Sequence, residues 1–203
     1  MSEHRPDAGP VFIDLARNRQ QWPLGIKLRR VLWSYLLQPL VRWLPKPLSP
    51  LRVSALRLMG ADIGSHCTIL PGVRVLMPWN LKLGDWAALG EGVNVYNFAP
   101  VTLGPHSVVS QFGYLCTGSH DYTRTDMPLT FAPITLGSQV WVAAGVFVAP
   151  GIAIADGVVV GAMSVVTRNL DQAWTIYAGN PCRRIKARPL PAAAADDQEG
   201  KPA

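Results

Sequence analysis

A six-residue period is the feature that most constrains the fold of this chain. From Leu136 onward, every sixth residue is aliphatic as far as Val166. Three earlier sets keep the same step, and each opens with an aliphatic residue followed by glycine, at Ile63, Leu83 and Leu103. A step of six matches neither an amphipathic helix, which repeats every 3.6 residues, nor a simple alternating strand. It is typical of a short flat strand followed by a corner.

Three such units close one triangular turn, so the repeat predicts an all-β fold, a parallel β-helix over residues 61–188. The aliphatic residue of each unit points inward, and the glycine after it permits backbone conformations at the corner that other residues resist. Successive turns then stack at about 4.8 Å, the ordinary strand spacing. A sandwich of short strands is the alternative, but its strands would not keep one period across four sets. The general crossover rule favours a right-handed coil, so the pattern itself does not determine the hand.

Residues 1–60 and 189–203 lack the repeat. The first stretch is rich in Leu, Trp and basic residues, and Pro39 predicts a break in its first helix. A second helix is expected from Ser49, as a cap, to Gly60. This helical extension either closes the open end of the coil or rests on a membrane face, and both interpretations stay open. The Pro- and Ala-rich end, 189–203, is expected to be a disordered tail.

Charge and cysteine content narrow the classes of partner and compartment. The net charge is +6, but the basic residues form no single block and no nucleic-acid module is present, so no nucleic-acid partner is expected. Three widely separated cysteines argue against a disulfide framework. The polar start lacks a secretory signal, and the longest apolar run, Val31 to Val41, is too short to cross a bilayer. We expect a cytoplasmic protein, with peripheral contact at the inner face of the membrane left open.

One insertion interrupts the coil and marks a candidate site. Between Leu115 and Leu136 the step stretches to 21, so about 15 residues leave the coil, and such excursions are usually functional. His120 stands where the chain departs. His66 and His106 instead share one corner position two turns apart, about 10 Å, which is too far for a shared zinc ion within one chain. We therefore expect exposed turn histidines there and no metal site.

Several motifs around this insertion go beyond the repeat. They read CTGSHDY, VFVAPGI and AGNPC, preceded by RLMGADIG and VNVYN. With the repeats, they resemble the hexapeptide-repeat acyltransferases, and most of all the colanic-acid (exopolysaccharide) acetyltransferases among them. The resemblance covers roughly residues 50–188. It implies a left-handed coil and a homotrimer whose cofactor cleft lies between neighbouring coils.

The resemblance also implies roles for individual residues. His120 matches the family's catalytic histidine, a general base that helps an acceptor hydroxyl attack the thioester of acetyl-CoA directly. The Ala143-Ala144-Gly145 turn departs from the Gly-Gly or Gly-Ser of many relatives, so contacts from a serine hydroxyl would be lost there. The positions implied to bind acetyl-CoA are Ala144, Ala162, Thr167, Arg168, Arg183 and Lys186.

Acceptor contacts are the least determined part of the site. Asn94, Asn97 and Glu91 precede the His120 turn by one turn of the coil, and amides and carboxylates suit sugar hydroxyls. Either asparagine can equally serve as a corner residue of the β-helix. Asp121 either orients the imidazole of His120 or only begins the loop.

These observations predict an acetyl-CoA-dependent O-acetyltransferase. Its expected acceptor is a sugar hydroxyl of an exopolysaccharide precursor, a carbohydrate that is free or lipid-linked. One alternative is a small-molecule acetyltransferase for a free sugar, serine or an amine. Two others are a zinc carbonic anhydrase and a non-catalytic scaffold on the same coil. The separation of His66 and His106 argues against the zinc enzyme, and the presence of His120 argues against the scaffold.

Overall fold

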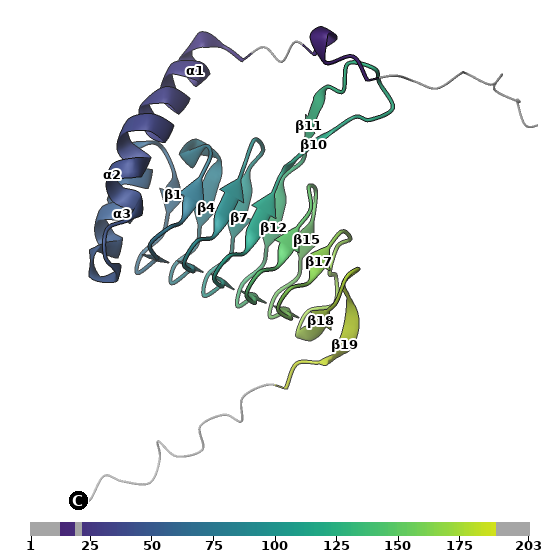
Figure 1. The fold of residues 1–203 in the computed structure, drawn as a ribbon. Helices are drawn as coiled ribbons and strands as arrows, with labels where there is room; N and C mark the ends of the chain where they lie inside the picture. Colours follow the sequence, from purple (N-terminus) through teal and green to yellow (C-terminus); the bar gives the residue numbers. More distant parts are fainter. Residues whose placement is uncertain (1–12, 19–21, 190–203) are drawn as a thin grey trace, which may run out of the picture.

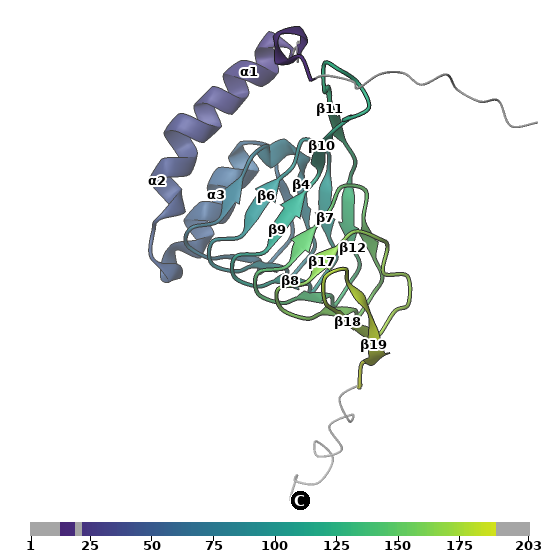
Figure 2. The ribbon, with the colours of Figure 1, turned by 45° about the vertical axis from the view of Figure 1, so that its right-hand side comes forward.

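The computed structural model describes residues 13–18 and 22–189. It is a three-sided parallel coil of about six turns, with helices across its N-terminal end (Figures 1 and 2). The expected tail, 189–203, lies outside the described residues apart from its first position. The predicted parallel β-helix with a short helical extension is confirmed.

Each side of the coil is a sheet of short strands, hydrogen-bonded from turn to turn. The first face consists of β1 (Asp62–Ile63), β4 (Leu81–Leu83), β7 (Val101–Leu103), β12 (Ile134–Leu136) and β15 (Ala153–Ile154). The second face consists of β2 (Thr68–Ile69), β5 (Ala88–Leu89), β8 (Val108–Val109), β13 (Trp141–Val142), β16 (Val159–Val160), β18 (Thr175–Ala178) and β19 (Arg183–Ala187). The third face consists of β3 (Arg74–Val75), β6 (Asn94–Tyr96), β9 (Tyr114–Cys116), β14 (Phe147–Val148) and β17 (Val165–Val166).

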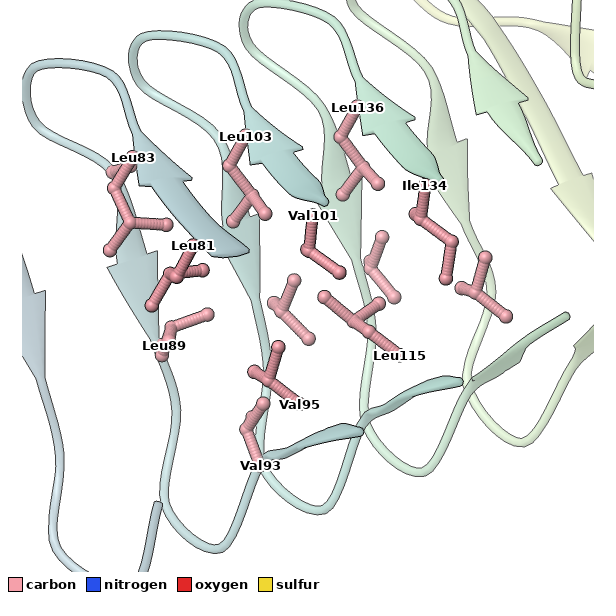
Figure 3. Close-up of a cluster of buried hydrophobic side chains, with 14 of the residues drawn as sticks. Leu81, Leu83, Leu89, Val93, Val95, Val101, Leu103, Leu115, Ile134 and Leu136 are labelled. Carbon is pink, nitrogen blue, oxygen red and sulfur yellow. The ribbon is translucent and has the colours of Figure 1, made fainter. Parts of the chain in front are cut away.

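The six-residue positions form the core of the coil. Leu83 pairs with Leu103, and Leu103 with Leu136, so one ladder of leucines runs down the first face. These side chains are buried and point into the interior, where Val95 and Leu115 meet them from the third face (Figure 3). All pairings within the coil are parallel except that between β18 and β19, which is antiparallel. The register aligns the aliphatic-Gly pairs that open the successive sets, Ile63 with Leu83, Leu83 with Leu103 and Leu103 with Leu136.

The helical extension begins with η1 (Leu15–Arg17) and continues through α1 (Leu24–Val31), η2 (Leu32–Leu37) and α2 (Gln38–Arg42). Pro39 was expected to break this helix, but the helix runs past it. The turn immediately before it, η2, is π-helical. Proline removes a backbone donor and crowds the carbonyl four residues earlier, and a π-helical segment accommodates that misfit without ending the helix. In this chain the proline therefore changes the helix type locally.

The segments α1, η2 and α2 form one continuous helix over residues 24–42, called the long helix below, and it covers an edge strand of the coil. Trp33 is buried, and its indole Nε1 donates to the carbonyl of Val75 at 2.7 Å. The amide oxygen of Gln38 accepts from the Val75 backbone N–H at 2.8 Å. Val75 ends β3, the outermost strand of the third face. The helix thus satisfies backbone groups that an open sheet edge would leave unpaired.

After η3 (Lys46–Leu48), the second expected helix is α3 (Ser49–Leu58). The side chains of Val53 and Leu56 in α3, and of Met59 just after it, belong to the buried core at the end of the coil, so α3 closes that end. Ser49 does not cap the helix as expected. Its hydroxyl accepts from the backbone N–H of Ile69 at 2.8 Å. The serine therefore satisfies a strand of the coil, because the first turn of strands has no preceding turn to pair with.

Candidate active site

The insertion forms a hairpin that projects from the coil at the corner between the third and first faces. Its strands are β10 (Gly118–His120) and β11 (Leu129–Phe131), paired antiparallel with His120 opposite Leu129. Figures 1 and 2 both show this hairpin standing away from the stacked turns. The predicted excursion is confirmed, and His120 lies on its first strand.

The imidazole of His120 is held by a backbone carbonyl. Its Nδ1 lies 2.8 Å from the carbonyl oxygen of Met127, on the far side of the hairpin loop. A carbonyl oxygen can only accept, so Nδ1 carries the hydrogen and donates it. The other ring nitrogen, Nε2, then keeps its lone pair in the neutral ring. Because the residue is exposed, this nitrogen is accessible to a substrate hydroxyl.

Asp121 does not orient the imidazole. Its carboxylate accepts from the backbone N–H of Thr123 at 3.0 Å and from the Thr123 hydroxyl at 2.6 Å. These two bonds hold the pKa of Asp121 below its usual value, because they stabilise the charged form. Of the two interpretations left open, the structure supports the one in which Asp121 begins the loop.

The N-terminal segment is fastened to the same hairpin. The side-chain amide of Asn18 donates to the Met127 carbonyl at 3.0 Å, so this oxygen accepts from both Asn18 and His120. The backbone N–H of Asp14 donates to the carbonyl of Thr125 at 2.7 Å. Sequence reasoning missed this connection, because neither a lone asparagine nor a backbone carbonyl leaves a recognisable pattern.

Aromatic stacking adds a second link between the extension and the hairpin. Trp22 stacks on Phe98 and on Phe131, with ring centroids 5.8 Å and 6.1 Å apart. Phe131 belongs to β11, and Phe98 lies at the corner from which the hairpin rises. Arg30, in α1, lies over the Phe98 ring. The long helix, the corner and the His120 hairpin are therefore packed together.

The proposed acceptor residues lie in three different environments, and Asn97 requires a correction. Asn97 is fully buried, and its amide accepts from the Met77 N–H at 2.9 Å and donates to the Met77 carbonyl at 2.8 Å. It is a corner residue that joins two turns, so its side chain is not available to an acceptor. Glu91 is exposed at the corner between the second and third faces, across the third face from the hairpin.

Asn94 lines a groove on the third face, beneath the long helix. The groove holds about 360 Å³, and its wall includes Arg74, Tyr96 and Tyr114 from neighbouring strands. A Cβ added to Gly118 would lie 3.3 Å from the Tyr96 ring, so the groove reaches the base of the hairpin. Burial raises the pKa of Tyr114 to about 12, which keeps its phenol protonated and able to donate. This groove was not foreseen, because its helix and its strands are distant in the sequence.

The residues implied to bind the cofactor extend along the coil. Ala144 and Ala162 occupy the corner between the second and third faces on successive turns, and the Met163 N–H donates to the Ala144 carbonyl at 2.8 Å. Thr167 and Arg168 are exposed at the opposite corner of the third face. The strand alignment places them two turns beyond the base of the hairpin.

The remaining two cofactor candidates lie at the C-terminal end of the coil. Arg183 and Lys186 are exposed on β19, which pairs with β18 at the edge of the second face. Together, the six positions form no single pocket within one chain. They lie at both corners of the third face and at the edge of the second face, spread over the C-terminal turns of the coil.

The other histidines form a stack without metal-binding geometry. The rings of His66 and Trp86 are 4.2 Å apart and those of Trp86 and His106 are 6.2 Å apart, one per turn at the same corner. Both histidines are exposed and have positive φ, as expected for turn positions. Within residues 13–18 and 22–189, no three His, Cys, Asp or Glu side chains are grouped to hold a metal ion.

Two solved structures of acetyltransferases share the fold of this chain. A maltose O-acetyltransferase from Clostridium difficile 630 matches with a TM-score of 0.73 and 24% identity, covering 81% of this chain and 89% of its own. A galactoside acetyltransferase in complex with coenzyme A matches with a TM-score of 0.74 and 23% identity, covering 85% and 88%. At these identities the likeness concerns the fold.

Sequence relatives identify the family. No family model matches the chain. The galactoside O-acetyltransferase of Escherichia coli K12 is 28% identical over 138 residues, 66% of this chain and 68% of that protein. The protein named as colanic acid biosynthesis acetyltransferase WcaF, also from Escherichia coli K12, is 43% identical over 164 residues, 81% of this chain and 90% of its own length. This chain therefore belongs to the hexapeptide-repeat acetyltransferases, in the family of the colanic acid biosynthesis acetyltransferases.

Proposed function

We propose that the protein is an acetyl-CoA-dependent O-acetyltransferase that modifies a sugar hydroxyl of an exopolysaccharide precursor. The observation that carries the proposal is the His120 imidazole: its Nδ1–H is bound by the Met127 carbonyl, which leaves the Nε2 lone pair free on an exposed residue. The identity with WcaF, a protein named for colanic acid biosynthesis, supports the polysaccharide class of acceptor.

The geometry around His120 suits general base catalysis. Nε2 accepts the proton of the acceptor hydroxyl as its oxygen attacks an acyl carbonyl, which raises the nucleophilicity of an otherwise weak alcohol. The imidazolium that forms is stabilised by the Met127 carbonyl, which keeps accepting from Nδ1. The same Nε2–H can then protonate the leaving thiolate, which returns the histidine to its starting state. Acetyl-CoA supplies the thioester, and no residue of this chain is acylated.

The cofactor candidates fit a long anionic ligand. Arg168, Arg183 and Lys186 are exposed, and none of them forms an ion pair with an acidic residue in the described part of the chain. Such cations can give charge-assisted hydrogen bonds to phosphates. Ala144 and Ala162 offer small side chains at a corner, which leaves the backbone approachable. We assign these five positions and Thr167 to acetyl-CoA, and residues 61–188 to the catalytic domain.

The groove under the long helix is the proposed acceptor site. Asn94 and Tyr114 offer hydrogen-bonding groups suited to sugar hydroxyls, and Tyr96 connects the groove to the base of the His120 hairpin. An acceptor screen that measures CoA release tests this assignment. Lipid-linked or polymeric glycans should give the fastest turnover, with slower turnover for free sugars. Efficient acetylation of serine or an amine, with none of any glycan, would instead establish a small-molecule acetyltransferase.

The assembly is proposed to be a homotrimer, as the family resemblance implies. The cofactor candidates of one chain are spread over separate corners of the coil, and a neighbouring coil would bring candidates of two chains to one cleft. Static light scattering at micromolar concentration should give about three times the chain mass of 22.1 kDa. A mass of one chain under these conditions would contradict the proposal.

A further inference from the structure

The outer side of the long helix presents a continuous apolar surface to solvent. Its residues recur three or four positions apart, so they share one helical face. Leu24, Tyr35, Leu40 and Trp43 are 70%, 77%, 72% and 68% exposed. The full set, called the outer apolar face below, is Leu24, Leu28, Val31, Leu32, Tyr35, Leu36, Leu40 and Trp43. Val31 and Tyr35 form its border on the side of the third face, where they also line grooves against the coil.

This face is not needed to hold the helix on the coil. The opposite side of the helix makes those contacts, through Trp33, Gln38 and the guanidinium of Arg42, which donates to the Gly72 carbonyl at 3.0 Å. Figures 1 and 2 show the helix lying across the N-terminal end of the coil, with one side turned away from the strands. A contiguous exposed surface of large apolar side chains usually marks a binding site.

The charge around the outer apolar face identifies the kind of partner. Residues 15–61 contain nine of the chain's 19 Lys and Arg residues and none of its 13 Asp and Glu residues. Two of these cations are exposed lysines: Lys27 lies in α1, and Lys46 lies four residues after the end of α2. A second copy placed against this face would bring like charges together, whereas an anionic lipid surface would neutralise them. Tyr35 and Trp43 are of the aromatic types enriched at the membrane–water boundary.

We propose that the outer apolar face docks the protein on an anionic phospholipid bilayer, with the helix lying in the plane of the interface. None of the described helices has the length and apolar content needed to span a bilayer. An in-plane helix needs only a long apolar face bordered by basic residues, and this helix has both. A trimer would carry three copies of this face, and their affinities would combine wherever more than one touches the same surface.

Docking would also place the active site at the membrane surface. Trp22 packs against Phe98 and Phe131 at the base of the hairpin, and Asn18 binds the Met127 carbonyl that orients His120. The apolar face and the catalytic hairpin are thus joined through the extension. This consequence rests on the proposed function: an acceptor glycan attached to a lipid would then be presented to His120 at the bilayer surface.

Vesicle sedimentation with the full chain tests the proposal. The protein should sediment with vesicles of phosphatidylcholine and phosphatidylglycerol at low salt, less as salt rises, and weakly with phosphatidylcholine alone. The variant Leu28→Ser/Leu36→Ser/Leu40→Ser should lose about tenfold or more of its vesicle affinity, because each leucine contributes apolar burial. A control, Phe112→Asn, removes an exposed aromatic side chain from a corner of the coil outside the helix, and should bind like the wild type.

A second variant, Lys27→Gln/Lys46→Gln, keeps the outer apolar face and should lose mainly the salt-sensitive part of vesicle binding. The control Lys82→Gln removes a cation of the coil outside the helix, and should bind vesicles like the wild type. Turnover of a soluble acceptor should be unchanged in the leucine variant, which separates this proposal from that of the function. Wild-type protein that stays in the supernatant with both vesicle types, or a leucine variant that sediments like the wild type, would overturn the proposal. A third result would also overturn it: a light-scattering mass of the leucine variant that is half the mass of the wild-type assembly. That result would show that the outer apolar face joins two copies of the assembly.

Discussion

Replacing His120 with alanine is expected to slow acetyl transfer by about 10²–10⁴-fold, the usual contribution of general acid–base catalysis. His120 is exposed, and among residues 13–18 and 22–189 its imidazole forms one hydrogen bond, to the Met127 carbonyl. Its loss should therefore leave the melting temperature and the affinity for acetyl-CoA nearly unchanged. Steady-state measurement of CoA release, with calorimetric binding of acetyl-CoA as the reference, checks both parts.

Two controls make the His120 prediction specific. His120→Asn keeps a side-chain amide that can donate to the Met127 carbonyl but has no basic nitrogen, so it should be as slow as alanine. His106→Ala removes a turn histidine that stacks on Trp86, and should retain normal turnover. If His120→Ala turned over its true acceptor at a near-normal rate, the mechanism would be wrong and another base would be required.

The fold could be predicted from sequence because one local rule determines it. An aliphatic residue recurs every six positions within each set, and the ladder from Leu83 through Leu136 joins the aliphatic-Gly pairs that open the sets, so no long-range information is needed to find it. The excursion that carries His120 was visible for the same reason, since a gap is conspicuous against a strict period. Local exceptions were less visible. Pro39 lies in a helix that adapts through a π-helical turn, an outcome set by packing rather than by propensity.

The chemistry of individual polar residues could be predicted only in part, because it depends on partners distant in sequence. Asn97 and Asn94 are three residues apart, yet one joins two turns through Met77 and the other lines an open groove. Both roles were compatible with the sequence, and only burial separates them. The group that orients His120 is a backbone carbonyl, so no residue type could have identified it.

The N-terminal extension has more than one role. Its helix α3 closes the end of the coil, which was one of the two roles that the sequence left open for the extension. The long helix pairs with the edge strand at Val75 and leaves its outer face free, so closing the end does not exclude contact with a membrane. Through Asn18 and Trp22 the same segment reaches the catalytic hairpin. A deletion of the extension would therefore confound stability, docking and catalysis, and point variants are the cleaner experiment.

Replacing Arg183 and Lys186 together with alanine should weaken acetyl-CoA binding by about 10²-fold or more, since hydrogen bonds to charged groups contribute about 1.5–3 kcal/mol each. Both side chains are exposed on β19, so their loss should leave the fold of the coil intact. Because the contacts are electrostatic, wild-type affinity should fall as salt rises, and the double variant should be less sensitive to salt. Isothermal calorimetry across a salt series measures both effects.

Arg184→Ala is the matched control, because Arg184 is equally exposed and lies between the two on the same strand. If Arg183 and Lys186 contact the phosphates individually, the Arg184 variant should bind acetyl-CoA nearly as the wild type does. If the three cations act only as a diffuse positive surface, each single replacement should weaken binding by a similar small factor that disappears at high salt. Unchanged affinity in the double variant would place the nucleotide end of the cofactor elsewhere. Arg168, which lies two turns beyond the hairpin at the same corner of the third face, would then be the next cation to replace.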